Sequence, residues 1–130
     1  MEKVRPFDPL FEGLFSSIIV STAETERQKY LLEMHKQVNK GILYVGIAGT
    51  GKTTIVKGYF ADCDNPINDS DVLHSQINFN NYTSSRTLQE VVEGKVEKRT
   101  GVLFGPPVGK TLIFFIDDLN MPVVDVYFTQ

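Results

Sequence analysis

Eight consecutive residues in the first half of the chain have the types and spacing that hold a phosphate group. Residues 46–53 read Gly-Ile-Ala-Gly-Thr-Gly-Lys-Thr and fit the pattern G-x-x-x-x-G-K-[ST]. Glycines let the backbone wrap tightly, so that successive N–H groups point at one anion. The lysine of such a loop reaches the β- and γ-phosphates of a nucleotide, and the final hydroxyl ligates Mg²⁺. The pattern therefore predicts a nucleoside-triphosphate site, with Lys52 on the phosphates and Thr53 on the metal.

The segments on both sides of this loop agree with that prediction. Residues 42–45 read Ile-Leu-Tyr-Val and predict a strand before the loop, and residues 53–60 predict a helix after it. The positive end of the helix dipole would lie at the same phosphates. We assign the following residues to the nucleotide site: Gly46, Gly49, Thr50, Gly51, Lys52, Thr53 and Thr54.

A second motif, further along the chain, places acidic residues at the end of an apolar run. Residues 111–116 read Thr-Leu-Ile-Phe-Phe-Ile, and Asp117 and Asp118 follow them. The run predicts a strand of a parallel sheet, buried on both faces. Acidic residues at its C-terminal end fall where open α/β sheets bind their ligands. We expect Asp117 to hold Mg²⁺ together with Thr53, and Asp118 to orient or deprotonate the attacking water.

The composition indicates a globular protein and excludes several other classes. With 42% hydrophobic and 22% charged residues, the chain is neither disordered nor embedded in a membrane, and its 130 residues make one domain at most. Its single cysteine, Cys63, excludes an internal disulfide and suits a reducing compartment. The formal net charge of −3 argues against a nucleic-acid surface.

The first half of the chain predicts one helix before the phosphate loop. Ser21 is the expected cap, with Glu24 reaching back to it, and Gly41 is the expected end of the helix. We expect the buried face of this helix to be formed by a stripe of Ala23, Arg27, Tyr30, Leu31, Met34 and Val38.

The second half predicts strands alternating with one helix. Residues 62–75 are expected to form a polar loop, and the alternation around Ile77 and Phe79 predicts a short strand. A helix is expected over residues 87–98, capped from within residues 83–85, and a small hairpin within residues 101–109. The buried side of that helix is expected to carry Leu88, Val91, Val92 and Val96. Strands alternating with helices predict an α/β sheet protein.

The residues around the acidic motif resemble a known family. Residues 115–122 read Phe-Ile-Asp-Asp-Leu-Asn-Met-Pro, and with residues 124–130 they are similar to the dynein heavy chain pattern F-[IV]-D-[DE]-[LI]-N-[ML]-P…D-x-Y-G-T-Q. Residues 22–27 resemble the T-x-[DE]-T-x-R that opens an AAA+ module of that motor. Further similar stretches are residues 83–85, 88–89, 95–99 and 104–110. The resemblance covers residues 15–130 and is best for the third of the six AAA+ modules in an axonemal-type heavy chain.

This resemblance implies a fold, cofactors and a role. The fold would be the large α/β subdomain of an AAA+ P-loop ATPase, a parallel sheet flanked by helices and incomplete at its C-terminus. ATP and Mg²⁺ would be the cofactors. In dyneins the first module is the main ATPase, and the nucleotide state of the third regulates how the ring releases microtubules. The implied role is a regulatory, ATP-binding module that hydrolyses ATP slowly and supports microtubule-based movement.

The resemblance also implies partners and a location. The partners would be the neighbouring AAA+ modules of the same heavy chain and, through the full motor, the intermediate and light chains of dynein and microtubules. Neither nucleic acid nor a membrane is expected as a partner. The expected location is the cytoplasm and cytoskeleton, in the axoneme of a cilium or flagellum.

Some site residues follow from the resemblance alone. Such modules cradle adenine, largely through backbone groups, where this chain has Val20, Ser21 and Thr22. Asp118 occupies the place of the glutamate that polarises water in most AAA+ proteins. Because its side chain is one methylene shorter, slow hydrolysis is expected. Phe128 replaces the glycine of Y-G-T-Q, which affects a backbone bend there.

We expect residues 1–20 to form a connecting arm and residues 21–130 to form a partial AAA+ P-loop ATPase domain. In the family a sensor strand, an arginine finger and a helical lid would follow, beyond the residues of this sequence. Four hypotheses stay open, with binding without turnover favoured over catalysis for this chain. The chain is a slowly hydrolysing motor module, a nucleotide-binding structural module without ATPase activity, or a truncated product. A different P-loop class such as a small kinase is the fourth.

Overall fold

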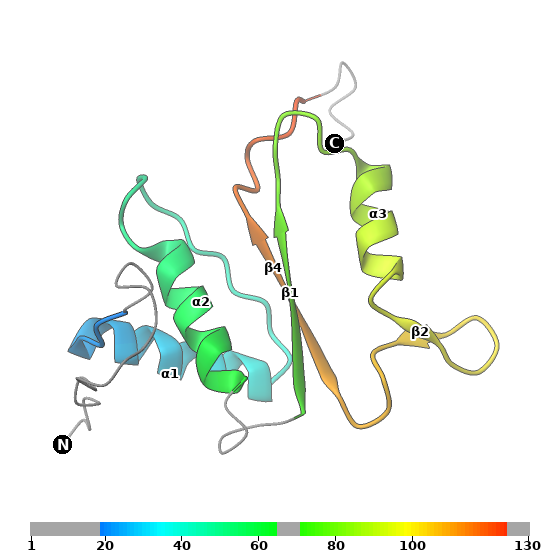
Figure 1. Cartoon of the computed structure of the whole chain (residues 1–130), viewed down its shortest axis with the longest axis horizontal. Coiled ribbons are helices and arrows are strands. Elements are labelled where there is room, and N and C mark those ends of the chain that lie inside the picture. Colours follow the sequence, from blue (N-terminus) through cyan, green and yellow to red (C-terminus); the bar gives the residue numbers. More distant parts are fainter. Residues whose placement is uncertain (1–18, 65–70, 125–130) are drawn as a thin grey trace, which may run out of the picture. The chain divides into compact units, whose positions relative to one another are not determined.

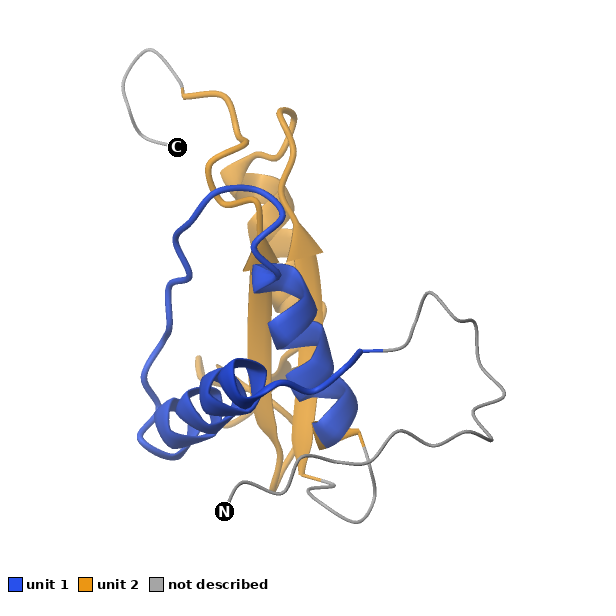
Figure 2. Cartoon of the chain, turned by 90° about the vertical axis from the view of Figure 1, so that its left-hand side faces the viewer, with its two compact units in different colours: residues 1–62 blue, residues 63–130 orange. Residues whose placement is uncertain are grey.

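The computed structural model describes residues 19–64 and 71–124, and divides the chain into two compact units, Met1–Asp62 and Cys63–Gln130 (Figures 1 and 2). The first unit contains helix α1, Ala23–Gln37, and nearly all of helix α2, Lys52–Cys63. The second contains strand β1, Val72–Asn78, helix α3, Ser85–Glu93, and three further strands. These are β2, Glu97–Lys98, β3, Phe104–Gly105, and β4, Thr111–Asp117. The arm predicted for residues 1–20 lies almost wholly outside the described residues and stays a prediction.

Helix α1 begins one residue later than predicted. Thr22, not Ser21, is the N-cap, because its Oγ1 accepts a hydrogen bond of 3.2 Å from the backbone N–H of Thr25. Thr25 returns the interaction, since its Oγ1 accepts from the backbone N–H of Thr22 at 2.8 Å. The predicted partner Glu24 is replaced by a threonine that closes the same reciprocal pair of hydrogen bonds.

The same helix ends earlier than predicted. Its last residue is Gln37, and Asn39 adopts a φ of 53°, the left-handed conformation that commonly ends helices. Asparagine tolerates this conformation better than most residues with a side chain. Gly41 is therefore not needed to end the helix.

The buried face predicted for α1 is wrong. All six residues of the predicted apolar stripe are exposed, with Tyr30 at 64% and Val38 at 60%. The half-buried side of the helix carries polar side chains instead, among them Lys29 and Glu33. Lys29 pairs with Asp62 of α2 at 2.9 Å, and Glu33 accepts a hydrogen bond from Tyr59 of α2 at 2.8 Å. This ion pair and this hydrogen bond determine which side of α1 contacts α2.

Helix α2 confirms the predicted helix after the phosphate loop. Its first turns contain β-branched residues, Thr53 to Val56, which have modest helix propensity. Burial supports the helix instead, because Val56, Tyr59, Phe60 and Cys63 follow the i, i+3, i+4, i+7 spacing of one face and are each at most 7% exposed.

The strand predicted over residues 42–45 is wrong for this structure. No strand is assigned there, and Leu43 and Val45 are 72% and 85% exposed. A strand is defined by backbone hydrogen bonds to a neighbour, and the two sheets of the described residues are β1–β4 and β2–β3. The apolar character of residues 42–45 alone does not supply such a neighbour.

The parallel sheet is present, formed by β1 and β4. Their register runs from Val72 opposite Thr111 to Asn78 opposite Asp117, and Figure 1 shows the two strands side by side. The predicted polar loop is thus too long, because β1 already begins at Val72. Because the backbone of this segment pairs with β4, polar residues such as His74 belong to the strand.

Strand β4 is half-buried from Leu112 to Asp117, not buried on both faces as predicted. Within residues 19–64 and 71–124, β1 is the one strand that pairs with β4.

Helix α3 is shorter than predicted and begins earlier. Ser84 is its N-cap and accepts a hydrogen bond from the N–H of Thr87 at 3.2 Å, while Gly94 ends the helix. No residue of α3 is buried. Within residues 85–98 the half-buried positions are the four predicted ones, Leu88, Val91, Val92 and Val96, so the predicted side is the least exposed side and not a buried one.

The predicted hairpin exists, but one of its strands lies before residue 101. Glu97 pairs with Gly105 and Lys98 with Phe104, antiparallel, around a turn in which Gly101 has a φ of 68°. Among residues 19–64 and 71–124, no helix is long and apolar enough to cross a membrane.

Candidate nucleotide-binding site

The loop between residues 46 and 52 has the backbone geometry of an anion cradle. Gly49 and Gly51 have φ values of 80° and 79°, a region that side-chain-bearing residues rarely adopt. The backbone N–H of Ile55 bonds to the carbonyl of Gly51 at 2.9 Å, so the helical hydrogen bonding of α2 starts directly at the loop. Because the dipole of a helix is positive at its N-terminus, this end of α2 favours a negatively charged group.

The ammonium group of Lys52 lies over the loop. It donates hydrogen bonds to the carbonyls of Ile47 at 2.7 Å and Gly46 at 2.9 Å, and it lies 3.3 Å from Oγ1 of Thr50. Thr50 in turn donates to the Ile47 carbonyl at 3.0 Å. The lysine that the motif assigns to phosphates is thus held at the loop by acceptors that phosphate oxygens could replace.

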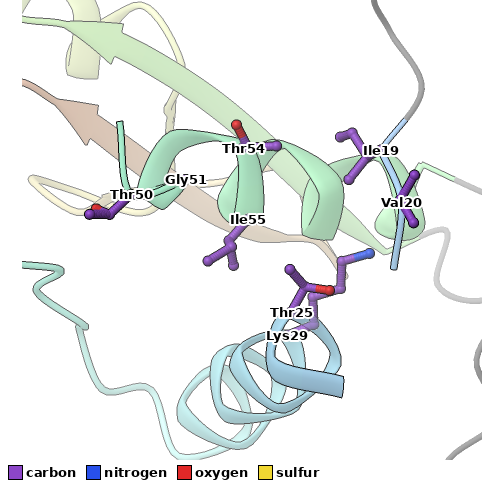
Figure 3. A pocket seen from close by; sticks show the side chains of 8 residues that line it. All are labelled: Ile19, Val20, Thr25, Lys29, Thr50, Gly51, Thr54 and Ile55. Atoms are coloured by element: carbon purple, nitrogen blue, oxygen red, sulfur yellow. The ribbon is translucent and has the colours of Figure 1, made fainter. Parts of the chain in front are cut away.

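A pocket of about 250 Å³ adjoins the loop within the first unit (Figure 3). Its walls come from the chain just before α1, from one side of α1 and from the start of α2. The lining residues are Ile19, Val20, Thr25, Lys29, Thr50, Gly51, Thr54 and Ile55. Most of these side chains are uncharged, which suits the base and sugar of a nucleotide better than its phosphates.

The pocket brings together part of the predicted nucleotide set. Thr50, Gly51 and Thr54 line it, and so does Val20, one of three residues expected to cradle adenine. Ser21 and Thr22 are not among its lining residues, and Thr22 serves as the N-cap of α1. These assignments of ligand contacts stay predictions.

Four lining residues were missed by the sequence reasoning: Ile19, Thr25, Lys29 and Ile55. Thr25 and Lys29 are four residues apart and so share one face of α1. The predicted buried face of α1, the stripe from Ala23 to Val38, lies on another side of the helix. The glycine at position 58, within the predicted helix, was the available signal that something approaches α2 closely there.

The acidic motif lies in the second unit, at the end of β4. Asp117 is half-buried and is the last residue of the strand, and its carbonyl accepts a hydrogen bond from the N–H of Phe79 at 3.0 Å. Asp118 is exposed and has a φ of 56°. Its carbonyl accepts from the N–H of Met121 at 2.9 Å, which closes a tight turn. Because Lys52 and Thr53 belong to the first unit, their joint action with Asp117 and Asp118 stays a prediction.

Comparison with known proteins identifies the family. The sequence pattern of the family described as the P-loop containing dynein motor region matches residues 11–130. The chain belongs to the P-loop dynein motor family. This confirms the predicted α/β P-loop class and the resemblance to dynein heavy chains, whereas the number of the module within a ring is not tested.

Dynein heavy chains of cilia and flagella resemble this motor-family chain over nearly all of its length. It is 41% identical to the dynein-1-alpha heavy chain of the flagellar inner arm I1 complex from Chlamydomonas reinhardtii, over 98% of this chain. It is 42% identical to dynein axonemal heavy chain 9 and 37% identical to dynein axonemal heavy chain 10, both from Homo sapiens, over 95% and 92% of this chain. The chain spans about 3% of the length of each of these relatives. The chain is thus similar to a short segment of these axonemal and flagellar heavy chains.

Proposed function

We propose that this chain binds Mg-ATP at the loop of residues 46–53 and acts as a regulatory module of a dynein heavy chain. The observation that carries the proposal is the position of the Lys52 ammonium, held by the carbonyls of Gly46 and Ile47 beside an uncharged pocket. A nucleotide could place its phosphates at the loop and its base and sugar in the pocket. Membership of the P-loop family supports the same ligand.

Residues of the loop have separate roles in this proposal. The left-handed glycines, Gly49 and Gly51, shape the backbone around the β-phosphate, and Gly46 and Thr50 complete the loop. Lys52 exchanges its carbonyl acceptors for phosphate oxygens and neutralises part of their charge. The N-terminus of α2 contributes its dipole at the same place.

The residues proposed for Mg²⁺ are Thr53 and Asp117. Their oxygen atoms are the type of ligand that Mg²⁺ prefers, and this ion usually takes one or two protein ligands together with phosphates and water. Within residues 19–64 and 71–124, no group of three His, Cys, Asp or Glu residues could hold a metal ion. The proposed ion therefore relies on the phosphates of the nucleotide for much of its coordination.

We favour binding without turnover for the chain by itself. An AAA+ site draws an arginine from a neighbouring module to stabilise the charge of the transition state. Asp118, proposed to orient the attacking water, is exposed and carries a short side chain, which suits slow hydrolysis in an assembled ring. The second candidate is a structural module in which nucleotide binds and is never hydrolysed.

The proposed setting is the motor of an axonemal dynein. The module would be the third of six in the ring and would contact its neighbours in the same heavy chain. Through the full motor it would act with intermediate and light chains on microtubules, in a cilium or flagellum. The motif resemblance supports the module number, and the flagellar and axonemal names of the relatives support the location.

Thermal unfolding of the 130-residue chain with and without Mg-ATP tests the binding proposal. A ligand present at about 100 times its Kd stabilises the folded state by about 2.7 kcal/mol. We expect ATP to raise the melting temperature of the wild type and to leave that of Lys52→Ala unchanged. Lys57→Ala is the matched control, because Lys57 is an exposed lysine of the same helix.

The outcomes separate the candidates. An ATP effect in the wild type and in Lys57→Ala, absent in Lys52→Ala, supports binding at the loop. Equal stabilisation of all three proteins would place the nucleotide elsewhere, and no stabilisation of the wild type would contradict the proposal. Release of phosphate by a ring that contains the module, lost on Asp118→Asn in this module, would distinguish a hydrolysing module from a structural one.

A further inference from the structure

The side chain of Lys29 crosses from α1 to α2 and ends in an ion pair. Its Nζ lies 2.9 Å from Oδ2 of Asp62 and 3.9 Å from Oε1 of Glu26. The Lys29 side chain is 13% exposed, which is low for a lysine, and that of Asp62 is 25% exposed. The lysine is therefore held in one orientation, with its charge compensated at the C-terminal end of α2.

Gly58 of α2 provides the space for this crossing. A Cβ atom at position 58 would lie 3.3 Å from Cε and 3.5 Å from Nζ of Lys29, and 3.6 Å from Cδ1 of Ile19. Glycine within a helix is unfavourable compared with alanine, and here the missing side chain admits two others. Lys29 and Ile19 thus pack against the backbone of α2 at the same place.

Both of these side chains also line the pocket next to the phosphate loop (Figure 3). Because Asp62 holds the ammonium group, the alkyl stem of Lys29 is left as the part that can serve as a wall. The other lining side chains, such as Val20 and Ile55, are uncharged. The pinned lysine thus keeps a wall of the pocket apolar, although its residue type is charged.

We propose that Lys29 is a positioning residue for the nucleoside part of the ligand, fixed in place by Asp62 and by the absence of a side chain at Gly58. The inference rests on the proposed nucleotide function, in which the phosphates lie at the loop and the base and sugar in the pocket, and it adds a residue that shapes one wall of that pocket. The loop around Lys52 recognises phosphates, and the wall that Lys29 and Ile19 form recognises the base and sugar. Lys29 acts through apolar contact and shape, and its charge serves to hold it to Asp62.

The test compares two ligands that differ by the nucleoside. Mg-tripolyphosphate offers the phosphates alone, and Mg-ATP offers the phosphates together with base and sugar. The Kd of each is measured by titration calorimetry on the 130-residue chain, at about 0.15 M salt to screen distant charges. The variants are Lys29→Ala, which removes the wall, Asp62→Asn, which releases the lysine, and Lys29→Arg, which keeps the ion pair and most of the stem. Lys57→Ala is the control.

We expect Lys29→Ala to weaken Mg-ATP binding about tenfold, comparable to losing the burial of about two methylene groups. Asp62→Asn is expected to weaken it about threefold, because a released lysine still spends part of its time in the wall. Mg-tripolyphosphate should bind all variants within a factor of about two, and Lys29→Arg should bind Mg-ATP like the wild type. Lys57→Ala should change neither ligand.

Other outcomes would overturn the inference. If Lys29→Ala and Asp62→Asn weaken the binding of Mg-ATP and Mg-tripolyphosphate equally, the ion pair only stabilises the fold. If Lys29→Ala leaves the Kd of Mg-ATP unchanged, Lys29 does not form a wall of the nucleoside pocket. If Lys29→Ala does not fold, Asp62→Asn decides by the same comparison, since it preserves the size of the side chain. A wild type that binds tripolyphosphate and ATP equally contradicts this inference alone, whereas a wild type that binds neither contradicts the proposed function as well.

Discussion

The phenol of Tyr59 donates a hydrogen bond of 2.8 Å to Oε2 of Glu33, which joins α2 to α1 across 26 positions of sequence. Tyr59 is 6% exposed. Burial of Glu33 acts to raise the pKa of its carboxyl group, but hydrogen bonds from Tyr59, Lys36 and Gln37 outweigh it, and the pKa lies below its ordinary value. Together with the Lys29–Asp62 ion pair, this contact determines which face of α1 meets the phosphate-loop helix.

We expect Tyr59→Phe to make the chain less sensitive to acid as well as less stable. A carboxyl group whose pKa is lowered on folding contributes stability above its unfolded pKa of about 4.3. That contribution is lost as the pH falls through the folded value. Removing the phenol should cost about 0.5–1 kcal/mol near neutral pH, because Glu33 is a third exposed and water screens it. The substitution should also reduce the amount by which the free energy of unfolding falls between about pH 5 and pH 3.

Urea unfolding of the wild type and Tyr59→Phe, near neutral pH and at about pH 3, measures this effect. Tyr30→Phe is the matched control, since Tyr30 is an exposed tyrosine of α1 and its change should be neutral at both pH values. An acid loss in Tyr59→Phe as large as that of the wild type would show that the Tyr59 hydrogen bond does not lower the pKa of Glu33.

Substitutions before α1 distinguish the observed cap from the predicted one. Thr22→Ala removes the side-chain oxygen that accepts from Thr25, and should destabilise the chain by about 1 kcal/mol. Ser21→Ala should change the free energy of unfolding by less than about 0.5 kcal/mol, because Ser21 is not the cap. Urea unfolding without nucleotide gives both values. A larger loss of stability for Ser21→Ala than for Thr22→Ala would show that Ser21 is the cap.

Glycine 49 should be far less replaceable than glycine 41. Gly49→Ala puts a side chain at a φ of 80°, a left-handed conformation that costs about 1–2 kcal/mol, although no atom stands within 4 Å of the new Cβ. Gly41→Ala also meets nothing within 4 Å, and Gly41 does not have a left-handed φ. We expect Gly49→Ala to lower the melting temperature and to reduce the increase in melting temperature that ATP produces. Gly41→Ala should change neither quantity. Equal melting temperatures would contradict the left-handed loop.

Asp118 is suited to its backbone conformation as well as to its proposed chemistry. At a φ of 56° aspartate and asparagine are tolerated better than residues with longer side chains. Asp118→Asn should therefore unfold at the same urea concentration as the wild type, while Asp118→Glu should lose about 1 kcal/mol. If Asp118→Glu proves as stable as the wild type, the turn that Asp118 forms with Met121 does not restrict the choice of residue.

Local features of the sequence predicted the loop and the elements beside it. The spacing of Gly46, Lys52 and Thr53, followed by a helix, requires only neighbouring residues, and the structure confirms α2. The same holds for β4, whose apolar run ends at Asp117 as predicted. The resemblance to dynein heavy chains could also be predicted from the sequence, because residues 115–122 contain its motif in one continuous stretch.

Features that depend on a distant partner were decided by the tertiary structure. The polar face of α1 was found to face α2 because Lys29 meets Asp62 and Glu33 meets Tyr59, contacts that no local pattern predicts. Likewise β1 begins at Val72 because β4 pairs with it, and residues 42–45 form no strand despite their apolar character. The sequence by itself determined the phosphate loop, the acidic strand end and the family. Only the tertiary structure decided which helix face lines the pocket, because an ion pair between residues 33 positions apart exists only when the chain is folded.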